Sequence, residues 1–157
     1  MRFRLVVLAC TISLPAALGI RADDSADEWH RRADAALESL LSKFWRQSRN
    51  YLRDAYPGTG ITGYWTFAQA FDGVLDAVER TGGARFAHFI DLLYQAQDAR
   101  GWYSEHYDDE SWMALALLRA YDATQESRYL EVAETLFRDI QTGWDETCCG
   151  ARPGGIW

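Results

Sequence analysis

Apolar residues recur at intervals of three and four along most of the chain, the period of one face of an α-helix. The first such segment predicts a helix over residues 26–51, and its apolar face consists of Trp29, Ala33, Ala36, Leu37, Leu40, Leu41 and Phe44. Further helices are predicted over residues 64–80, 84–97 and 127–140. Period-2 alternation of β-branched residues, which would indicate strands, is absent from the sequence. The pattern predicts an all-α protein.

Another helix, the fourth of five in chain order, is predicted from the acidic residues 108–110 through the segment SWMALALLRAYDAT, residues 111–124. Its nearly continuous apolar surface predicts burial on most sides. Turn-forming stretches separate the helices: YPGTGITG at 56–63, TGG at 81–83, DARGWYSEHY at 98–107, and a loop-like end from 143 to 157. Gly82 and Gly83 are expected to cap the helix that precedes them.

Part of the sequence repeats with an offset of 43 residues. Residues 78–94 align with 121–137, pairing Thr81 with Thr124, Arg85 with Arg128, Phe86 with Tyr129, Asp91 with Glu134, Leu93 with Leu136 and Tyr94 with Phe137. A helical hairpin cannot bury its apolar face alone, so such units stack into solenoids or close into rings, and periods of about 40 to 47 residues are typical of them. The repeat predicts an array of helical hairpins.

The length and net charge of the chain limit the number of domains and the kinds of ligand to expect. The 157 residues correspond to about one domain, and the net charge of -7 provides no basic stripe for phosphates, so nucleic acid is not an expected partner. An uncharged or polar ligand fits better.

Residues 1–22 have the features of a secretory signal peptide. Arg2 and Arg4 precede an apolar run from residue 5 to 18, followed by small residues, and cleavage is plausible after either Gly19 or Ala22. The run is short for a membrane anchor, and lipidation at Cys10 is disfavoured by its sequence context. We expect a secreted or cell-wall associated protein, with no membrane segment after cleavage.

The remaining residues, 23–157, hold two adjacent cysteines, Cys148 and Cys149. Neighbouring cysteines close a ring that demands an unusual backbone, so they are expected to pair with other partners rather than with each other. Because the chain stops at Trp157 within a predicted loop, residues 23–157 are expected to be the N-terminal portion of a longer domain.

The segment HYDDESW, residues 106–112, holds consecutive carboxylates, Asp108 and Asp109, followed by Glu110. Acidic residues at a helix start cap free N–H groups and complement the helix dipole. The same pair also suits glycoside hydrolysis, which needs two carboxyl groups, because the first residue of a loop-to-helix junction is free to turn. Aromatic side chains on which a sugar could stack are Trp65, Trp102, Tyr103, Tyr107 and Trp112, although each is separately typical of a core.

Histidines add no second site to this picture. His106 and the neighbouring acids match no zinc or calcium spacing, so no metal is expected. His30 and His88 fall within predicted helices and are expected on the surface.

The segment from Tyr107 to Gly150, with its Asp-Asp pair followed by ALALLRAYD, resembles glycoside hydrolase family 76, the α-1,6-mannanases and their fungal cell-wall relatives. The segment GYWTFAQAFDGVLDAVERTG, residues 63–82, is similar to that family's upstream helix. The resemblance implies an (α/α)6 toroid, of which this chain would be about the first half. It also implies retaining, endo-acting cleavage of α-1,6-linked mannan, as polysaccharide or oligosaccharide, without metal or cofactor.

The resemblance also assigns roles to residues. Asp108 would be the nucleophile and Asp109 the general acid/base, and the expected substrate-binding residues are Tyr107, Trp65, Trp112 and Trp144. In the family, the loop after the fifth helix reads near CGGGIWW and lines the sugar groove; here it is CCGARPGGIW. Two alternatives stay open: a non-catalytic helical-repeat module that binds glycan or protein, and another (α/α)6 sugar-processing enzyme, such as an unsaturated-uronyl hydrolase or an epimerase.

Overall fold

The computed structural model describes residues 26–83, 85–148 and 154–156. This part of the chain contains five helices: α1 (Ala26–Phe44), α2 (Tyr64–Thr81), α3 (His88–Asp98), α4 (Tyr107–Thr124) and α5 (Ser127–Thr142). Four two-residue strands form two small antiparallel ribbons, in which β1 (Trp45–Arg46) pairs with β2 (Tyr51–Leu52) and β3 (Trp144–Asp145) pairs with β4 (Gly155–Ile156). The all-α prediction is confirmed.

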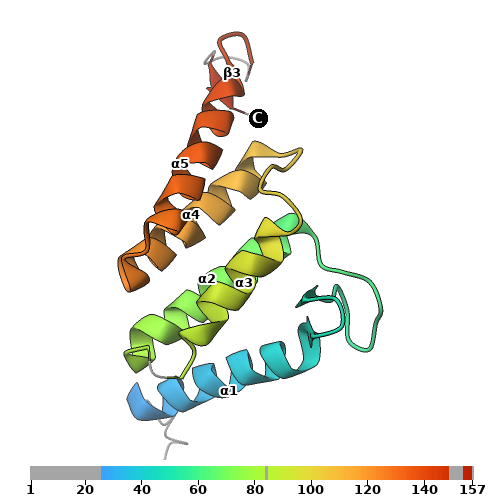
Figure 1. Ribbon diagram of the computed structural model, residues 1–157, viewed down its shortest axis with the longest axis vertical. Coiled ribbons are helices and arrows are strands. Elements are labelled where there is room, and N and C mark those ends of the chain that lie inside the picture. Colours follow the sequence, from blue (N-terminus) through green and yellow to red (C-terminus); the bar gives the residue numbers. More distant parts are fainter. Residues whose placement is uncertain (1–25, 84, 149–153, 157) are drawn as a thin grey trace, which may run out of the picture.

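The helices form hairpins that stack side by side. In Figure 1, α1, α3 and α5 run in one direction, and α2 and α4 run in the other. The first residues of α2 and α4 therefore lie at the same end of the array. The most extensive helix contacts are those of α4 with α5 and of α2 with α4. The loops that precede α2 and α4 therefore lie at the same end of the molecule.

The core lies between α2 and its neighbours, because α2 buries residues on several of its sides. Its fully buried large side chains come from all parts of the array except α1: Phe67, Phe71, Ile90, Leu93, Met113, Leu117, Tyr129 and Leu136. Helix α1 adds Leu37 and Leu41, and the arginine of α2 at position 80 pairs with Asp34 of α1. The core holds the start of α4 in a fixed place relative to α2.

The 43-residue repeat is present in the structure. Helices α2 and α4 both have 18 residues, and their first and last residues are 43 apart. Each is followed by a residue in the left-handed conformation, Gly82 with φ 65° and Gln125 with φ 61°. The hydroxyls of Thr81 and Thr124 both donate to the carbonyl four residues earlier. Helices α2 and α4 are therefore the equivalent helices of two copies of one repeat unit.

Three predicted details of the helices are wrong. The first helix ends at Phe44 rather than near Tyr51, because the chain turns back as the β1–β2 ribbon, where the Tyr51 hydroxyl donates to Gln97 and its ring stacks on Phe67. The third helix begins at His88 rather than at 84. Helix α4 is not buried on most sides: its exposed apolar side chains are Trp112, Leu115 and Leu118.

Two predictions concern residues outside the described part of the chain. The predicted signal peptide lies outside the described residues; within them, no helix is long and apolar enough to cross a membrane. Cys148 is disulfide-bonded, and Cys149 also lies outside the described residues, so the predicted absence of a bond between these two stays a prediction.

Candidate active site

Asp108 and Asp109 are the second and third residues of α4, which begins at Tyr107. The backbone N–H of Asp109 donates to Oδ1 of Asp108 at 3.0 Å, so the pair does satisfy part of the helix start, as the capping interpretation requires. Because both residues are already helical, their side chains diverge by about 100°. The expectation that Asp108 would be free to turn at a junction is therefore wrong, and the two carboxyl groups have different surroundings.

Asp108 lines a groove of about 390 Å³ together with Tyr107, Ser111, Ile140 and Ile156. The groove therefore lies between the start of α4, the end of α5 and β4. Tyr107 is fixed at its edge: its hydroxyl lies 3.4 Å from Oγ1 of Thr142, and its ring lies directly against Gly143. Ile156, which follows α5, contributes to the lining of this groove.

Asp109 faces the other way, toward the loop between α3 and α4. The Ser104 hydroxyl donates to Oδ2 of Asp109 at 3.4 Å and accepts the backbone N–H of His106. Tyr64 lies close by and donates to the Trp102 carbonyl at 2.5 Å. Burial raises the pKa of the Tyr64 hydroxyl, and negative charge on Glu110 and Asp109 raises it further. Asp109 is thus half-buried among polar groups, whereas Asp108 is exposed.

Glu110 is the acidic residue that sequence reasoning placed only at the helix start, yet it is 0% exposed. Its Oε1 accepts the backbone N–H of Ser104 at 2.7 Å. Burial raises the pKa of the Glu110 carboxyl, and the nearby Asp139 carboxyl adds to this, against the lowering effect of the Ser104 amide. The repeat offered a signal, because the residue 43 positions before Glu110 is the buried Phe67.

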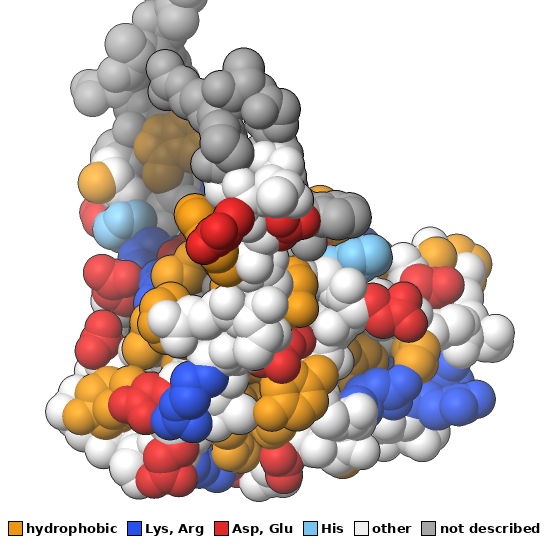
Figure 2. Space-filling view, turned by 90° about the horizontal axis from the view of Figure 1, so that it is seen from above, with side chains coloured by type: hydrophobic (Ala, Val, Ile, Leu, Met, Phe, Trp, Pro, Cys, Tyr) orange, Lys and Arg blue, Asp and Glu red, His pale blue; other side chains and the backbone are white. Residues whose placement is uncertain are grey.

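Of the predicted sugar-stacking residues, Trp65, Tyr103, Trp112 and Trp144 are exposed, whereas Trp102 and Tyr107 are partly buried. Trp112 is 46% exposed and one turn after Asp108 on the same face of α4. Trp65 is 50% exposed and occupies in α2 the position of Asp108 in α4, 43 residues earlier. Trp144 is 59% exposed and pairs across the β3–β4 ribbon with Ile156, which lines the groove. Figure 2 views the molecule from above relative to Figure 1, and acidic and hydrophobic side chains lie next to one another on that surface.

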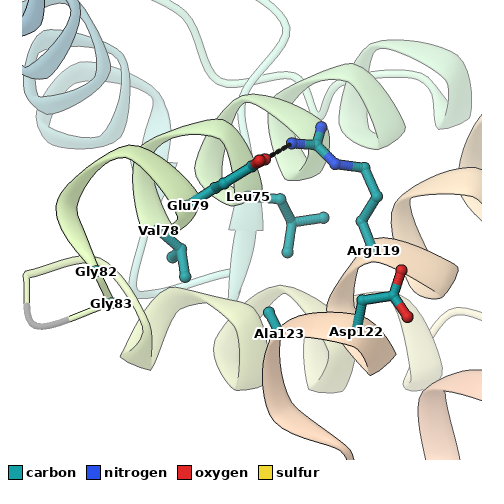
Figure 3. A pocket seen from close by; sticks show the side chains of 8 residues that line it. All are labelled: Leu75, Val78, Glu79, Gly82, Gly83, Arg119, Asp122 and Ala123. Carbon is teal, nitrogen blue, oxygen red and sulfur yellow. Dashed lines mark hydrogen bonds and ion pairs between the residues drawn. The ribbon is translucent and has the colours of Figure 1, made fainter.

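A second cavity, of about 470 Å³, lies at the opposite ends of α2 and α4 (Figure 3). It is lined by Leu75, Val78, Glu79, Gly82, Gly83, Arg119, Asp122 and Ala123. Arg119 is already held by Asp72, Asp76 and Glu79 of α2, at 2.5, 2.6 and 3.2 Å. These charges join the two helices, and no aromatic side chain lines the cavity, so the groove at Asp108 is the better candidate for a sugar site.

Metal-binding groups do not gather anywhere in the described part of the chain: it contains no cluster of three or more histidine, cysteine or acidic side chains placed to hold an ion. His106 is exposed and precedes the first residue of α4. His30 and His88 are exposed on helices, as expected.

A stacked array of helical hairpins with a carboxylate pair at one end is the arrangement expected of part of a helical toroid. The profile of glycosyl hydrolase family 76 matches residues 28–157, and the chain belongs to this family. Its fold is accordingly part of an (α/α)6 toroid. A search of curated proteins finds no match.

Solved structures agree with this assignment. The chain is similar to the α-1,6-mannanase GH76A from Salegentibacter sp. HEL1_6, with 26% identity and a TM-score of 0.73 over 82% of this chain and 37% of that one. It is similar to the Lin0763 protein from Listeria innocua, with 29% identity and a TM-score of 0.70 over 82% and 39%. The family 76 mannosidase Bt3792 from Bacteroides thetaiotaomicron VPI-5482 has 28% identity and a TM-score of 0.63 over 81% and 40%. The chain therefore spans well under half the length of these relatives.

Proposed function

We propose that the chain carries both catalytic carboxylates of a secreted, retaining glycosidase that cleaves α-1,6-linked mannan. The observation that carries the proposal is the placement of Asp108 in the groove, with Asp109 next to it in the chain at the start of α4 and the exposed Trp112 one turn further along the helix. Family membership supports glycosidase chemistry.

The solved relatives support α-1,6-mannan as the substrate and the aspartate pair as the catalytic residues. The Salegentibacter relative is an α-1,6-mannanase, and inactive variants of it with two consecutive aspartates replaced were solved with α-1,6-mannotriose and α-1,6-mannotetrose. Between residues 28 and 157 this chain has one pair of consecutive aspartates, Asp108 and Asp109.

In the proposed mechanism, the Asp108 carboxylate attacks the anomeric carbon and forms a covalent glycosyl ester, while Asp109 gives its proton to the departing glycosidic oxygen. Asp109 then takes a proton from water, which attacks the same carbon and releases Asp108 with net retention. The exposed position of Asp108 suits a nucleophile that must reach the sugar. The Ser104 hydroxyl gives Asp109 a fixed partner while its protonation changes.

The test replaces each acid by its amide. Asp108→Asn and Asp109→Asn should each lower the cleavage of α-1,6-mannan by about a thousandfold or more, since each removes one of two required groups. Asp122→Asn is the matched control, because Asp122 is exposed at the far end of the same helix. A 2-fluoro-mannosyl inhibitor should label Asp108. Near-normal cleavage by either active-site variant, or labelling of another residue, would contradict the proposed roles.

Secretion has its own test. We propose that residues 1–22 are removed during export, so the protein recovered from the medium or cell wall should begin near Ile20 or Asp23. Recovery of the chain only inside cells with residue 1 intact would contradict this.

A second candidate function is glycan binding without turnover. It is favoured by the exposed side chains of Trp65, Trp112 and Trp144, on which a sugar ring could stack whether or not it is cleaved. Calorimetry with α-1,6-mannooligosaccharides, run beside the cleavage assay, separates the two: binding with no product favours the binding module, whereas product formation favours the enzyme.

A further inference from the structure

Glu110 is a buried acid in a place where the fold itself does not need one. The first repeat unit has Phe67 at the position of Glu110, and Ala96 at the position of Asp139, which faces Glu110 from α5. Both Phe67 and Ala96 are buried and apolar. An acid in such a place is costly unless its hydrogen bonds compensate for burial. The second unit therefore has two neighbouring carboxyl groups, Glu110 and Asp139, where the first unit has an apolar pair.

Glu110 is connected to Asp109 through hydrogen bonds that both residues make with Ser104. Oε1 of Glu110 accepts the Ser104 N–H at 2.7 Å, and the hydroxyl of the same serine donates to Asp109. Glu110 and Asp109 are thus linked both along the helix and through one loop residue. Without the Glu110 acceptor, no other side chain of the described residues holds the Ser104 amide.

The rest of this loop is also tied down by polar groups. Gln97, which is itself buried, donates to the Gly101 carbonyl at 2.7 Å. Tyr64 donates to the Trp102 carbonyl at 2.5 Å. These two contacts hold the early part of the loop, whereas Glu110 holds the part that touches the acid.

We propose that Glu110 is a positioning residue, whose buried carboxyl fixes the loop 101–106 through the Ser104 amide so that the Ser104 hydroxyl stays against Asp109. The proposal rests on the proposed function, in which Asp109 is the acid/base. Glu110 itself does not touch the substrate groove, whose lining is Tyr107, Asp108, Ser111, Ile140 and Ile156.

The protonated form of Glu110 suffices for this role, because Oε1 accepts the amide hydrogen in either form. Oε2 meets no hydrogen-bond donor among the described residues, and the neighbouring Asp139 carboxyl favours the protonated form of Glu110 both by repulsion and through a side-chain hydrogen bond, which raises the pKa of Glu110. A glutamine at this position would keep the acceptor and bring an N–H group toward Asp139. Methionine has a similar volume and helix propensity but no acceptor.

The experiment compares Glu110→Gln and Glu110→Met in the full chain, with Val78→Ala as a control for lost stability. Val78 is buried near the end of α2, beside the second cavity, whereas the loop 101–106 precedes α4 at the other end of the array. Two measurements are made on each variant: the kcat and KM for α-1,6-mannotetraose, and the hydrogen-exchange protection of the Ser104 amide.

In Glu110→Met the Ser104 amide should lose its protection, and kcat should fall by about 10- to 100-fold with KM within about threefold, as expected for a misplaced catalytic group. Glu110→Gln should keep the protection and restore kcat to within about threefold of the parent. Val78→Ala should lower thermal stability and leave both readouts unchanged.

Normal kcat or intact Ser104 protection in Glu110→Met would overturn the proposal, as would a Glu110→Gln variant as impaired as Glu110→Met. If the parent chain cleaves no mannan substrate, the proposed function fails. The exchange measurement then still decides whether Glu110 holds the loop.

Discussion

Gly143 and Gly73 provide a paired test of how the groove is packed, because the same substitution should have opposite effects. An alanine Cβ at Gly143 would overlap the ring of Tyr107, whereas at Gly73, inside α2, it would meet no atom within 4 Å. Gly143 has φ -77°, which alanine adopts without strain, so its effect is one of space alone. The two variants thus separate steric conflict from backbone entropy.

The magnitudes follow from these surroundings. Overpacking costs about 1–3 kcal/mol, and glycine to alanine at a compatible backbone returns about 0.4–1 kcal/mol, so Gly143→Ala should destabilise by about 1–2 kcal/mol. Gly73→Ala should stabilise by about 0.5–1 kcal/mol, the usual gain in a helix interior. Each 1 kcal/mol corresponds to a shift in Tm of about 2–8 °C for a chain of this size.

The assay is urea unfolding of both variants beside the parent chain, followed by calorimetry with α-1,6-mannotriose. Since relief of the overlap displaces the Tyr107 ring from the groove edge, Gly143→Ala should also weaken sugar binding, and Gly73→Ala should not. Equal stability of Gly143→Ala and the parent, or a shift of both variants in the same direction, would refute the steric reasoning.

Two further predictions concern the helix end and the buried acid. Gln125→Gly should stabilise the chain by up to about 1 kcal/mol in urea unfolding, because a left-handed residue other than glycine is strained. Gln125→Ala should destabilise the chain, since it keeps that strain and loses the side-chain hydrogen bonds to the carbonyls of Tyr121 and Asp122. A less stable glycine variant than alanine variant would contradict this reasoning. Glu110→Gln should stabilise the chain more at about pH 7 than at about pH 4. Burial and Asp139 raise the pKa of Glu110 above 4.5 in the folded chain, so the unfolded chain loses this proton first as pH rises. The parent chain therefore loses, above pH 4.5, stability that it has below this pH, whereas the glutamine variant does not. A stability difference between variant and parent that does not change with pH would contradict a raised pKa of Glu110.

The helices were largely predictable because their signals are local. Apolar residues at intervals of three and four predicted α2 to within one residue of its observed end and α5 to within two residues. Gly82 ends α2 because a left-handed residue there costs glycine nothing. The end of α1 was not predictable in this way, because Tyr51 and Leu52 continue an apolar pattern but are buried by contacts with α2 and α3.

The candidate site was likewise predictable only where its signals are local in the sequence. The sequence located the acids at a helix start and the aromatic residues near them, because an Asp-Asp pair before an apolar segment is visible in one dimension. It did not give the different surroundings of Asp108, Asp109 and Glu110, since three consecutive helical residues point in three directions and only the neighbouring elements decide what each one meets.

By itself, the sequence determined the helical hairpins, their 43-residue repeat and the position of the carboxylate pair, since periodicity, turn residues and a contiguous motif are properties of the chain alone. Only the tertiary structure decided that Asp108 faces a groove, that Asp109 faces a loop, and that Glu110 is buried beneath them. The physical reason is that these environments are made by residues 5 to 48 positions away along the chain, from Ser104 and Tyr64 to Asp139 and Ile156, which meet the start of α4 only when the hairpins stack.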